Sequence, residues 1–232
     1  MTRIIRVRGI GENPKAANML RGVTDMCPGF YVSELPWSAS YGVVPLPFGQ
    51  SFAASVAQGE LLLRRELDNN GPAIILGYSG GAAVAGNVAD QGHRNIIAVG
   101  LIADPFQPES VTRNGKFGVA GSREIRNTKH VKWVWNPRDM ICQADRNSPI
   151  RTVADATARM SLKNPDEWKN DLLTRITKRK WQEIRRHPLD FRALVADALQ
   201  AKEDVESYLD GAQHQTAYYN RRADLAHWVM TQ

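Results

Sequence analysis

The stretch AIILGYSGG, residues 73–81, joins a short apolar run directly to a glycine-rich turn, and the small residues AAVA follow it at 82–85. An apolar run bounded by glycine is typical of a buried strand, and the small residues favour a helix that packs closely on a sheet. The turn contains a G-x-S-x-G pattern, which also occurs by chance in ordinary glycine-rich turns. Between a strand and a helix, however, the pattern predicts a nucleophile elbow, with Ser79 as the nucleophile.

Strand-like and helical segments alternate on both sides of this turn. The expected strands are 3–8, 30–35, 73–76, 95–103 and 130–135, and the expected helices are 50–68 and 80–89, with a helical pattern from 149 to the end. This alternation favours an α/β fold with a mostly parallel sheet and right-handed crossovers. No repeat, low-complexity stretch or linker divides the chain, so we expect residues 1–232 to form a single domain.

Bulk composition excludes several classes of protein. The chain has 232 residues, of which 43% are hydrophobic, and this is enough for a sizeable core. It contains no apolar run of membrane-spanning length, and it begins with an expected strand where a secretory leader would place an apolar core. Two cysteines are too few for a disulfide framework or a cysteine zinc site. We expect Cys27 and Cys142 to be buried free thiols, although a single bridge between them stays open.

The positive charge of the chain is concentrated in one region. The net charge is +6, and residues 146–186 contain eleven Lys or Arg against five Asp or Glu. Residues 149–210, between the candidate acid and the candidate base, are expected to form a helical cap in which Trp168, Leu172 and Ile176 share a face. Either this cap offers an apolar platform for an acyl chain, with basic residues contacting an anionic envelope, or it is an ordinary amphipathic element with a solvated face.

A serine nucleophile needs a base, and the chain has five histidines. His93 and His130 precede strands, so both should lie at the wrong end of the sheet. His187 is expected to be exposed, and His227 is expected to be a partly buried structural residue of an amphipathic helix. His214 follows every strand and comes after a turn, so a loop can bring it to the nucleophile. His187 and His227 stay open as alternatives for the base.

Two aspartates could orient this imidazole. Asp104 ends the strand after the nucleophile strand, and Asp139 ends the next one. Both follow the chain order Ser, Asp, His of hydrolases with this fold, but only Asp139 lies at the second strand past the nucleophile, where the acid is usual. The alternative role for Asp104 is to accept backbone hydrogen bonds in an Asp-Pro turn.

Several segments in chain order resemble a known family. RVRGIGE (6–12) looks like the first strand and oxyanion loop of cutinase-like serine esterases. GYSGG (77–81), ADPFQPES (103–110), NPRDMIC (136–142) and HQTAYY (214–219) resemble corresponding segments of the phage lysin B enzymes. These enzymes are mycolylarabinogalactan esterases of phages that infect mycobacteria and their relatives.

The resemblance implies a cutinase-like α/β-hydrolase fold of three layers, with Ser79, Asp139 and His214 as the triad. It implies no metal or organic cofactor. Residue 10 is Ile where Thr or Ser would be usual, so the oxyanion hole would use only the backbone N–H groups of Ile10 and Gly80. Tyr78 and Trp168 are expected to contact the substrate.

The leading hypothesis is therefore an endolysin-type esterase that cleaves the ester between mycolic acids and arabinogalactan. The protein would be made in the host cytoplasm without a signal peptide and would reach the envelope after phage-induced permeabilisation of the membrane. It would lack the N-terminal peptidoglycan-binding domain that some lysin B proteins carry. Two alternatives stay open: a cutinase-like lipase or carboxylesterase of broader specificity, and a non-catalytic basic nucleic-acid-binding protein, although no nucleic-acid-binding motif is present. The oligomeric state cannot be read from the sequence.

Overall fold

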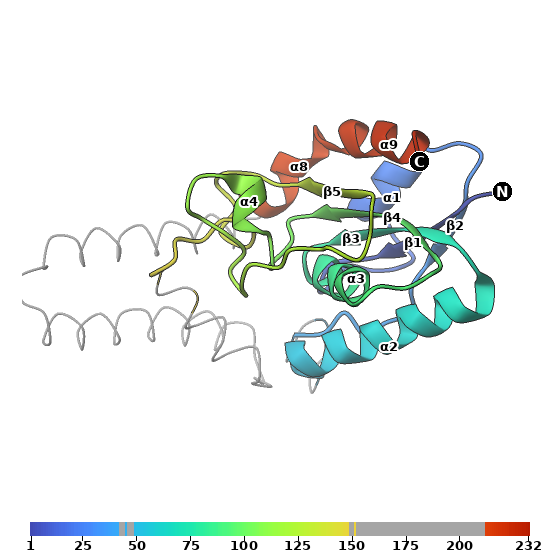
Figure 1. Ribbon diagram of the computed structural model, residues 1–232, viewed down its shortest axis with the longest axis horizontal. Coiled ribbons are helices and arrows are strands. Elements are labelled where there is room, and N and C mark those ends of the chain that lie inside the picture. The colour runs from blue at the N-terminus through green and yellow to red at the C-terminus, as the bar shows by residue number, and fades with distance from the viewer. Residues whose placement is uncertain (42–44, 46–48, 149–150, 152–211) are drawn as a thin grey trace, which may run out of the picture.

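A five-stranded parallel sheet forms the centre of the molecule (Figure 1). The computed structural model describes residues 1–41, 45, 49–148, 151 and 212–232. The strand order is β2-β1-β3-β4-β5, and every neighbouring pair is parallel. The strands are β1 (Arg3–Val7), β2 (Tyr31–Glu34), β3 (Ala73–Tyr78), β4 (Ile96–Ile102) and β5 (Val131–Val134).

Helices cover both faces of this sheet. The helices of the described residues are α1 (Met19–Thr24), α2 (Phe52–Asn70), α3 (Gly80–Gln91), α4 (Glu109–Thr112), the π-helical turn η2 (Ala212–Thr216), α8 (Ala217–Tyr219) and α9 (Arg222–Met230). Helices α2 and α3 lie on one face, and α1 and α9 lie on the other (Figure 1).

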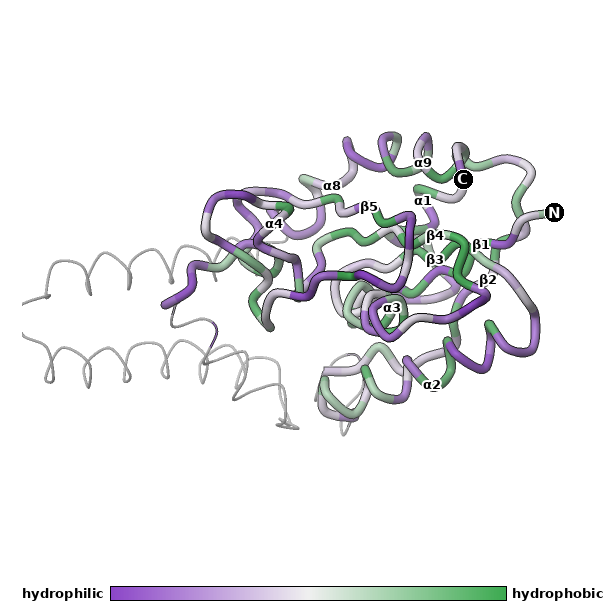
Figure 2. The backbone as a smooth tube through the Cα atoms, in the orientation of Figure 1, coloured by the Kyte–Doolittle hydropathy of each residue, from purple (hydrophilic) through white to green (hydrophobic). Residues whose placement is uncertain are grey.

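Two hydrophobic cores result from the alternation of side chains along the strands. Ile5 and Ile75 belong to the core under α2 and α3, whereas Ile4, Ile74 and Leu76 belong to the core under α1 and α9. Successive strand residues point to opposite faces, so a strand that is covered on both sides is apolar throughout. Figure 2 shows this hydrophobic character along β3 and β4 in the middle of the molecule. Each such side chain contributes roughly 2 kcal/mol on full burial.

Local signals set the ends of the long helix α2. The Ser51 side chain accepts a hydrogen bond from the Ala54 N–H at the start of the helix. Gly71 ends it with a φ of 79°, a conformation that suits glycine, and its N–H bonds to the Leu67 carbonyl. In the part of the chain that the structure describes, no helix combines the length and the apolar character that crossing a membrane requires.

The predicted fold class is confirmed: the protein has an α/β fold built on an all-parallel sheet with helices on both faces. The strands were placed correctly: the predicted starts of β1 and β3 match the observed ones, and every other predicted boundary differs by one or two residues. The short helix α1 was missed. It begins at the Asn18 cap, whose side chain accepts from the Arg21 N–H, and its few residues show too little periodicity to be recognised. The expected cap at 149–210 falls almost wholly outside the described residues.

Candidate active site

Ser79 stands on a strained turn between β3 and α3. Its φ of 53° and ψ of −119° lie in a region that non-glycine residues rarely adopt. Its N–H donates to the Ile102 carbonyl at 2.9 Å, which extends the pairing of β3 with β4 up to the turn. The serine side chain therefore leaves the sheet at the carboxyl ends of the strands, where functional groups of parallel sheets gather.

The glycines on both sides of Ser79 allow a close approach of backbones. A Cβ on Gly77 would lie 2.7 Å from the Ala82 Cα, and a Cβ on Gly81 would lie 1.9 Å from the Val7 carbonyl oxygen. Neither obstacle is the flexible end of a side chain, so neither can move away. The G-x-S-x-G pattern is required here because α3 turns back tightly against β1 and β3.

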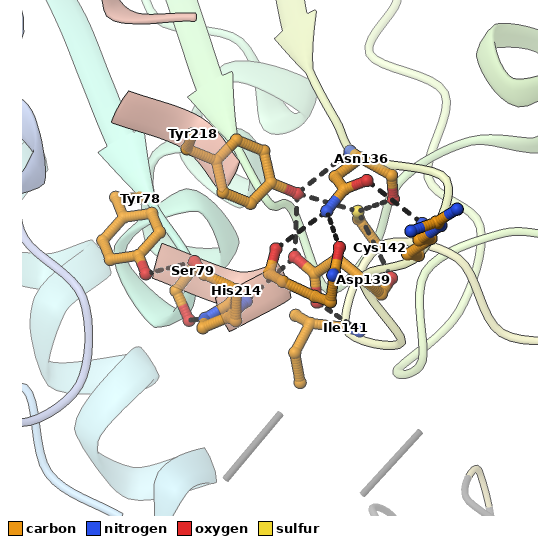
Figure 3. A network of polar contacts seen from close by, with 10 residues as sticks. Tyr78, Ser79, Asn136, Asp139, Ile141, Cys142, His214 and Tyr218 are labelled. Atoms are coloured by element: carbon orange, nitrogen blue, oxygen red, sulfur yellow. Dashed lines mark hydrogen bonds and ion pairs between the residues drawn. The ribbon is translucent and has the colours of Figure 1, made fainter. Parts of the chain in front are cut away.

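The structure brings Ser79, His214 and Asp139 together in one hydrogen-bonded chain (Figure 3). The His214 Nε2 lies 2.8 Å from the Ser79 Oγ, and the His214 Nδ1 lies 2.9 Å from the Asp139 Oδ2. All three side chains are nearly buried, with 9%, 5% and 1% exposure for the serine, the histidine and the aspartate. This is the geometry in which an imidazole can take a proton from a hydroxyl while a carboxylate orients the ring.

His214 lies in the π-helical turn η2 rather than in the loop that the sequence suggested. The Tyr78 hydroxyl donates to the His214 carbonyl at 2.7 Å, and the two rings stack with their centroids 5.4 Å apart. The Asn136 side-chain amide donates to the Gln213 carbonyl at 3.0 Å. These two side chains, from β3 and from the loop after β5, hold the turn against the sheet.

Asp139 is held by a tight turn that follows β5. Its N–H donates to the Asn136 carbonyl at 3.0 Å, and its Oδ1 accepts the Ile141 N–H at 3.0 Å. Its Oδ2 accepts the Tyr218 hydroxyl at 2.8 Å in addition to the imidazole. Three donors thus surround a carboxylate that is almost completely removed from water, and they fix its orientation.

Asp104 is engaged elsewhere. Its Oδ1 accepts the Phe106 N–H at 2.9 Å, as expected for an Asp-Pro turn, and its Oδ2 pairs with Arg123 at 2.6 Å and accepts from the Trp133 Nε1 at 3.3 Å. Burial raises the pKa of the Asp104 carboxyl, and the Arg123 guanidinium acts in the opposite direction. The pair joins β4 to the loop before β5, and the structure places Asp139, not Asp104, against the imidazole.

The other described histidines lie away from Ser79. His93 precedes β4 and contacts the Asp68 carboxylate at 3.2 Å, and His130 is exposed just before β5. His227 is exposed on α9, so the expectation of partial burial was wrong. The hydrophobic stripe of that helix is narrow, and position 227 lies outside it. His187 falls outside the described residues.

The loop of residues 9–12 lies beside the elbow at Ser79. The Gly9 N–H donates to the Glu12 Oε2 at 2.8 Å, and the Gly11 N–H donates to the Ala39 carbonyl at 3.1 Å. Among the described residues, the Ile10 N–H has no acceptor. The Ile10 side chain lies against Gly80, since a Cβ on that glycine would be 2.7 Å from it.

Ile10 and Gly80 are therefore neighbours at the elbow. The Gly80 N–H is the first of α3, where N–H groups lack intrahelical acceptors and the positive end of the helix dipole lies. The assignment of both N–H groups to an oxyanion hole stays a prediction, which this arrangement supports.

Three supporting residues were missed by sequence reasoning: Glu12, Asn136 and Tyr218. Only Tyr218 left a usable signal, because it comes four residues after His214 in a helical segment and so shares its face. Tyr78 was expected to contact the substrate, but it is 3% exposed and its hydroxyl bonds to the histidine backbone. Its substrate contact stays a prediction, and its burial argues against it. Trp168, the other expected contact, lies outside the described residues.

Neither cysteine takes part in a bridge. Cys27 and Cys142 are both free and buried, as predicted. Within residues 1–41, 45, 49–148, 151 and 212–232, no group of three His, Cys, Asp or Glu side chains gathers to hold a metal ion.

The parallel sheet and its helical layers match the fold of solved α/β-hydrolases. The crystal structure of lysin B from Mycobacteriophage D29 superposes with a TM-score of 0.55 at 13% sequence identity, over 89% of this chain and 88% of that one. A cutinase-like protein from Cryptococcus sp. gives a TM-score of 0.42 at 20% identity, over 69% of this chain and 96% of the other. At these identities the likeness shows the fold alone, and it rests on the lysin B structure. No protein-family model matches the sequence, and no curated protein is similar to it.

Proposed function

We propose that the protein is a serine esterase that hydrolyses carboxylic esters through Ser79, His214 and Asp139. One observation carries the proposal: an unbroken chain of hydrogen bonds from the Ser79 Oγ through the imidazole to the Asp139 carboxylate, with distances of 2.8 and 2.9 Å. The serine also occupies the strained backbone position that lifts a nucleophile clear of a sheet.

In the proposed reaction, the His214 Nε2 takes the hydroxyl proton as the Ser79 Oγ attacks the ester carbonyl carbon. The carbonyl oxygen becomes an oxyanion, which the N–H groups of Ile10 and Gly80 would stabilise by roughly 3 kcal/mol each. The tetrahedral intermediate then breaks its bond to the alcohol oxygen, and the imidazolium returns the proton to that oxygen. Water attacks the acyl-enzyme by the same path and releases the acid. Asp139 keeps the Nδ1 protonated and stabilises the imidazolium charge.

For the natural substrate, we propose the ester that joins mycolic acids to arabinogalactan. Support comes from the sequence resemblance of the elbow, acid and histidine segments to the phage lysin B family, and from a fold shared with one such protein. The protein would then act at the envelope of the host after the phage has permeabilised the membrane.

The test of the chemistry is hydrolysis of a short p-nitrophenyl ester by the wild type and by Ser79→Ala. The matched control is Ser110→Ala, since Ser110 is exposed on α4. We expect activity from the wild type and the control and a loss of at least about a thousandfold in Ser79→Ala. Equal turnover by the wild type and Ser79→Ala would remove the esterase proposal.

The test of the substrate is incubation with purified mycolylarabinogalactan, followed by detection of free mycolic acid. Release by the wild type but not by Ser79→Ala is the expected result. Activity on p-nitrophenyl esters without release of mycolic acid would instead favour a cutinase-like carboxylesterase of broader specificity.

A further inference from the structure

Tyr218 contacts the candidate triad at Asp139 and has no exposed surface. It stands on α8, four residues after His214, and its ring belongs to the core under α1 and α9. Burial of a phenol hydroxyl is costly unless the group finds hydrogen-bond partners. The partners that it finds here are parts of the candidate active site (Figure 3).

The hydroxyl has one proton, and its surroundings direct that proton to Asp139. The Asn136 N–H donates to the phenol oxygen at 3.1 Å, so this contact uses a lone pair. The Cys142 Sγ lies 3.3 Å away and can serve as donor or weak acceptor. The Asp139 Oδ2, at 2.8 Å, is a carboxylate oxygen and can accept. The phenol therefore donates its hydrogen bond to the Asp139 Oδ2, the strongest of these acceptors.

The Asp139 Oδ2 also accepts the His214 Nδ1–H, at 2.9 Å. Two donors thus share the Oδ2 of Asp139, while the Ile141 N–H occupies the Oδ1 at 3.0 Å. Without Tyr218, the Ile141 N–H and the imidazole would be the only groups of the described residues to restrain rotation of the carboxylate about its Cβ–Cγ bond.

The phenol stays protonated throughout. Burial, with the negative charge of Asp139 close by, raises the pKa of Tyr218. Burial and the charge of Asp139 likewise raise the pKa of the Cys142 thiol well above its usual range. In the part of the chain that the structure describes, the titratable side chains that face the hydroxyl are the neutral Cys142, Asp139 itself and, across that carboxylate, His214. Asp104 acts on the thiol from the turn after β4.

We propose that Tyr218 is a positioning residue for the candidate reaction: its hydroxyl orients the Asp139 carboxylate and shares the Oδ2 with His214. The inference rests on the proposed esterase function. In this role, the Tyr218 hydroxyl sets how strongly the Asp139 carboxylate binds the imidazolium of His214.

The first experiment compares Tyr218→Phe with Tyr219→Phe, the matched control, whose hydroxyl belongs to a side chain that is 48% exposed. In Tyr218→Phe we expect kcat to fall about tenfold with KM nearly unchanged, since the Asp139 carboxylate would lose a restraint on its rotation and would orient the imidazole less well. We also expect the acidic limb of the kcat/KM profile to move to higher pH, because an unshared Oδ2 binds the imidazolium more strongly. A folded Tyr218→Phe with the wild-type kcat and pH profile overturns the proposal, and a merely structural role would leave the profile in place.

The second experiment needs no variant and no activity. In the wild-type protein, the Tyr218 hydroxyl proton and the His214 Nδ1 proton should give slowly exchanging NMR resonances joined by a nuclear Overhauser effect, since both point at one oxygen. Absence of this effect while both resonances are visible overturns the proposal, even if Tyr218→Phe fails to fold. Because this measurement does not depend on ester hydrolysis, failure of the proposed function in the Ser79→Ala assay is distinguishable from failure of the Tyr218 assignment.

Discussion

The two candidate acids can be separated by matched substitutions, Asp139→Asn and Asp104→Asn. Each removes one negative charge and keeps the size of the side chain. Asp139 is hydrogen-bonded to the imidazole, whereas Asp104 pairs with the buried Arg123. We expect the first substitution to reduce activity at nearly constant stability, and the second to reduce stability at nearly constant activity.

The size of the first effect follows from the contacts of Asp139. If the new amide keeps its oxygen on the Ile141 N–H, its NH₂ faces the His214 Nδ1 and imposes the tautomer that cannot accept the serine proton. If the amide flips, its neutral oxygen faces the imidazole, and its NH₂ opposes the Ile141 N–H. Both arrangements lose the carboxylate charge, so kcat/KM should fall by about 10²–10⁴, or roughly 3–5 kcal/mol on the barrier.

The size of the second effect follows from the surroundings of Arg123. Loss of one partner of a buried ion pair costs about 3–5 kcal/mol, and the lower value applies here because the guanidinium keeps the Asn87 side chain and the Ala83 carbonyl as acceptors. For a chain of this size, about 3 kcal/mol lowers the melting temperature by roughly 6–12 °C. At temperatures well below the melting transition, kcat/KM should stay within about threefold of the wild type.

The assay is p-nitrophenyl ester hydrolysis together with thermal unfolding followed by circular dichroism. The reasoning is refuted if Asp139→Asn keeps more than a tenth of the wild-type kcat/KM. It is also refuted if Asp104→Asn is inactive while it melts at the wild-type temperature, since Asp104 would then serve the chemistry directly.

Two further predictions concern strain and thiol chemistry. Because Ser79 has a φ of 53°, Ser79→Gly should relieve backbone strain that Ser79→Ala retains. Both variants should be inactive, and denaturant unfolding should find the glycine variant about 1 kcal/mol more stable. Equal stability would mean that the turn is not strained. Burial raises the pKa of both Cys27 and Cys142. The fraction of reactive thiolate is therefore small below the raised pKa and increases only as the pH rises through it. The native protein should therefore leave both thiols unmodified by a disulfide reagent at pH 8 and react with two equivalents after denaturation, whereas fast reaction of the native protein contradicts their burial.

Much of the fold was predictable because its signals are local. The apolar run at β3 is fully buried, and the run at β4 is buried from Ala98 to Ile102; such runs are readable without knowledge of their partners. Helix α1 is too short to show a recognisable helical period of hydrophobic residues in the sequence. The exposure of His227 was not predictable either, because it depends on which face of α9 packs against α1 and β5.

By itself, the sequence determined the succession of the five strands and of helices α2 and α3 along the chain, the turn at Ser79 and the short set of residues from which a base and an acid could come. These follow from hydrophobic periodicity and from the steric freedom of glycine, which act between near neighbours. Only the tertiary structure decided that Asp139 rather than Asp104 faces the imidazole, and that Tyr218 donates to the same carboxylate. Those contacts join residues 75 and 79 positions apart, so they depend on strand order and helix docking, which no local pattern encodes.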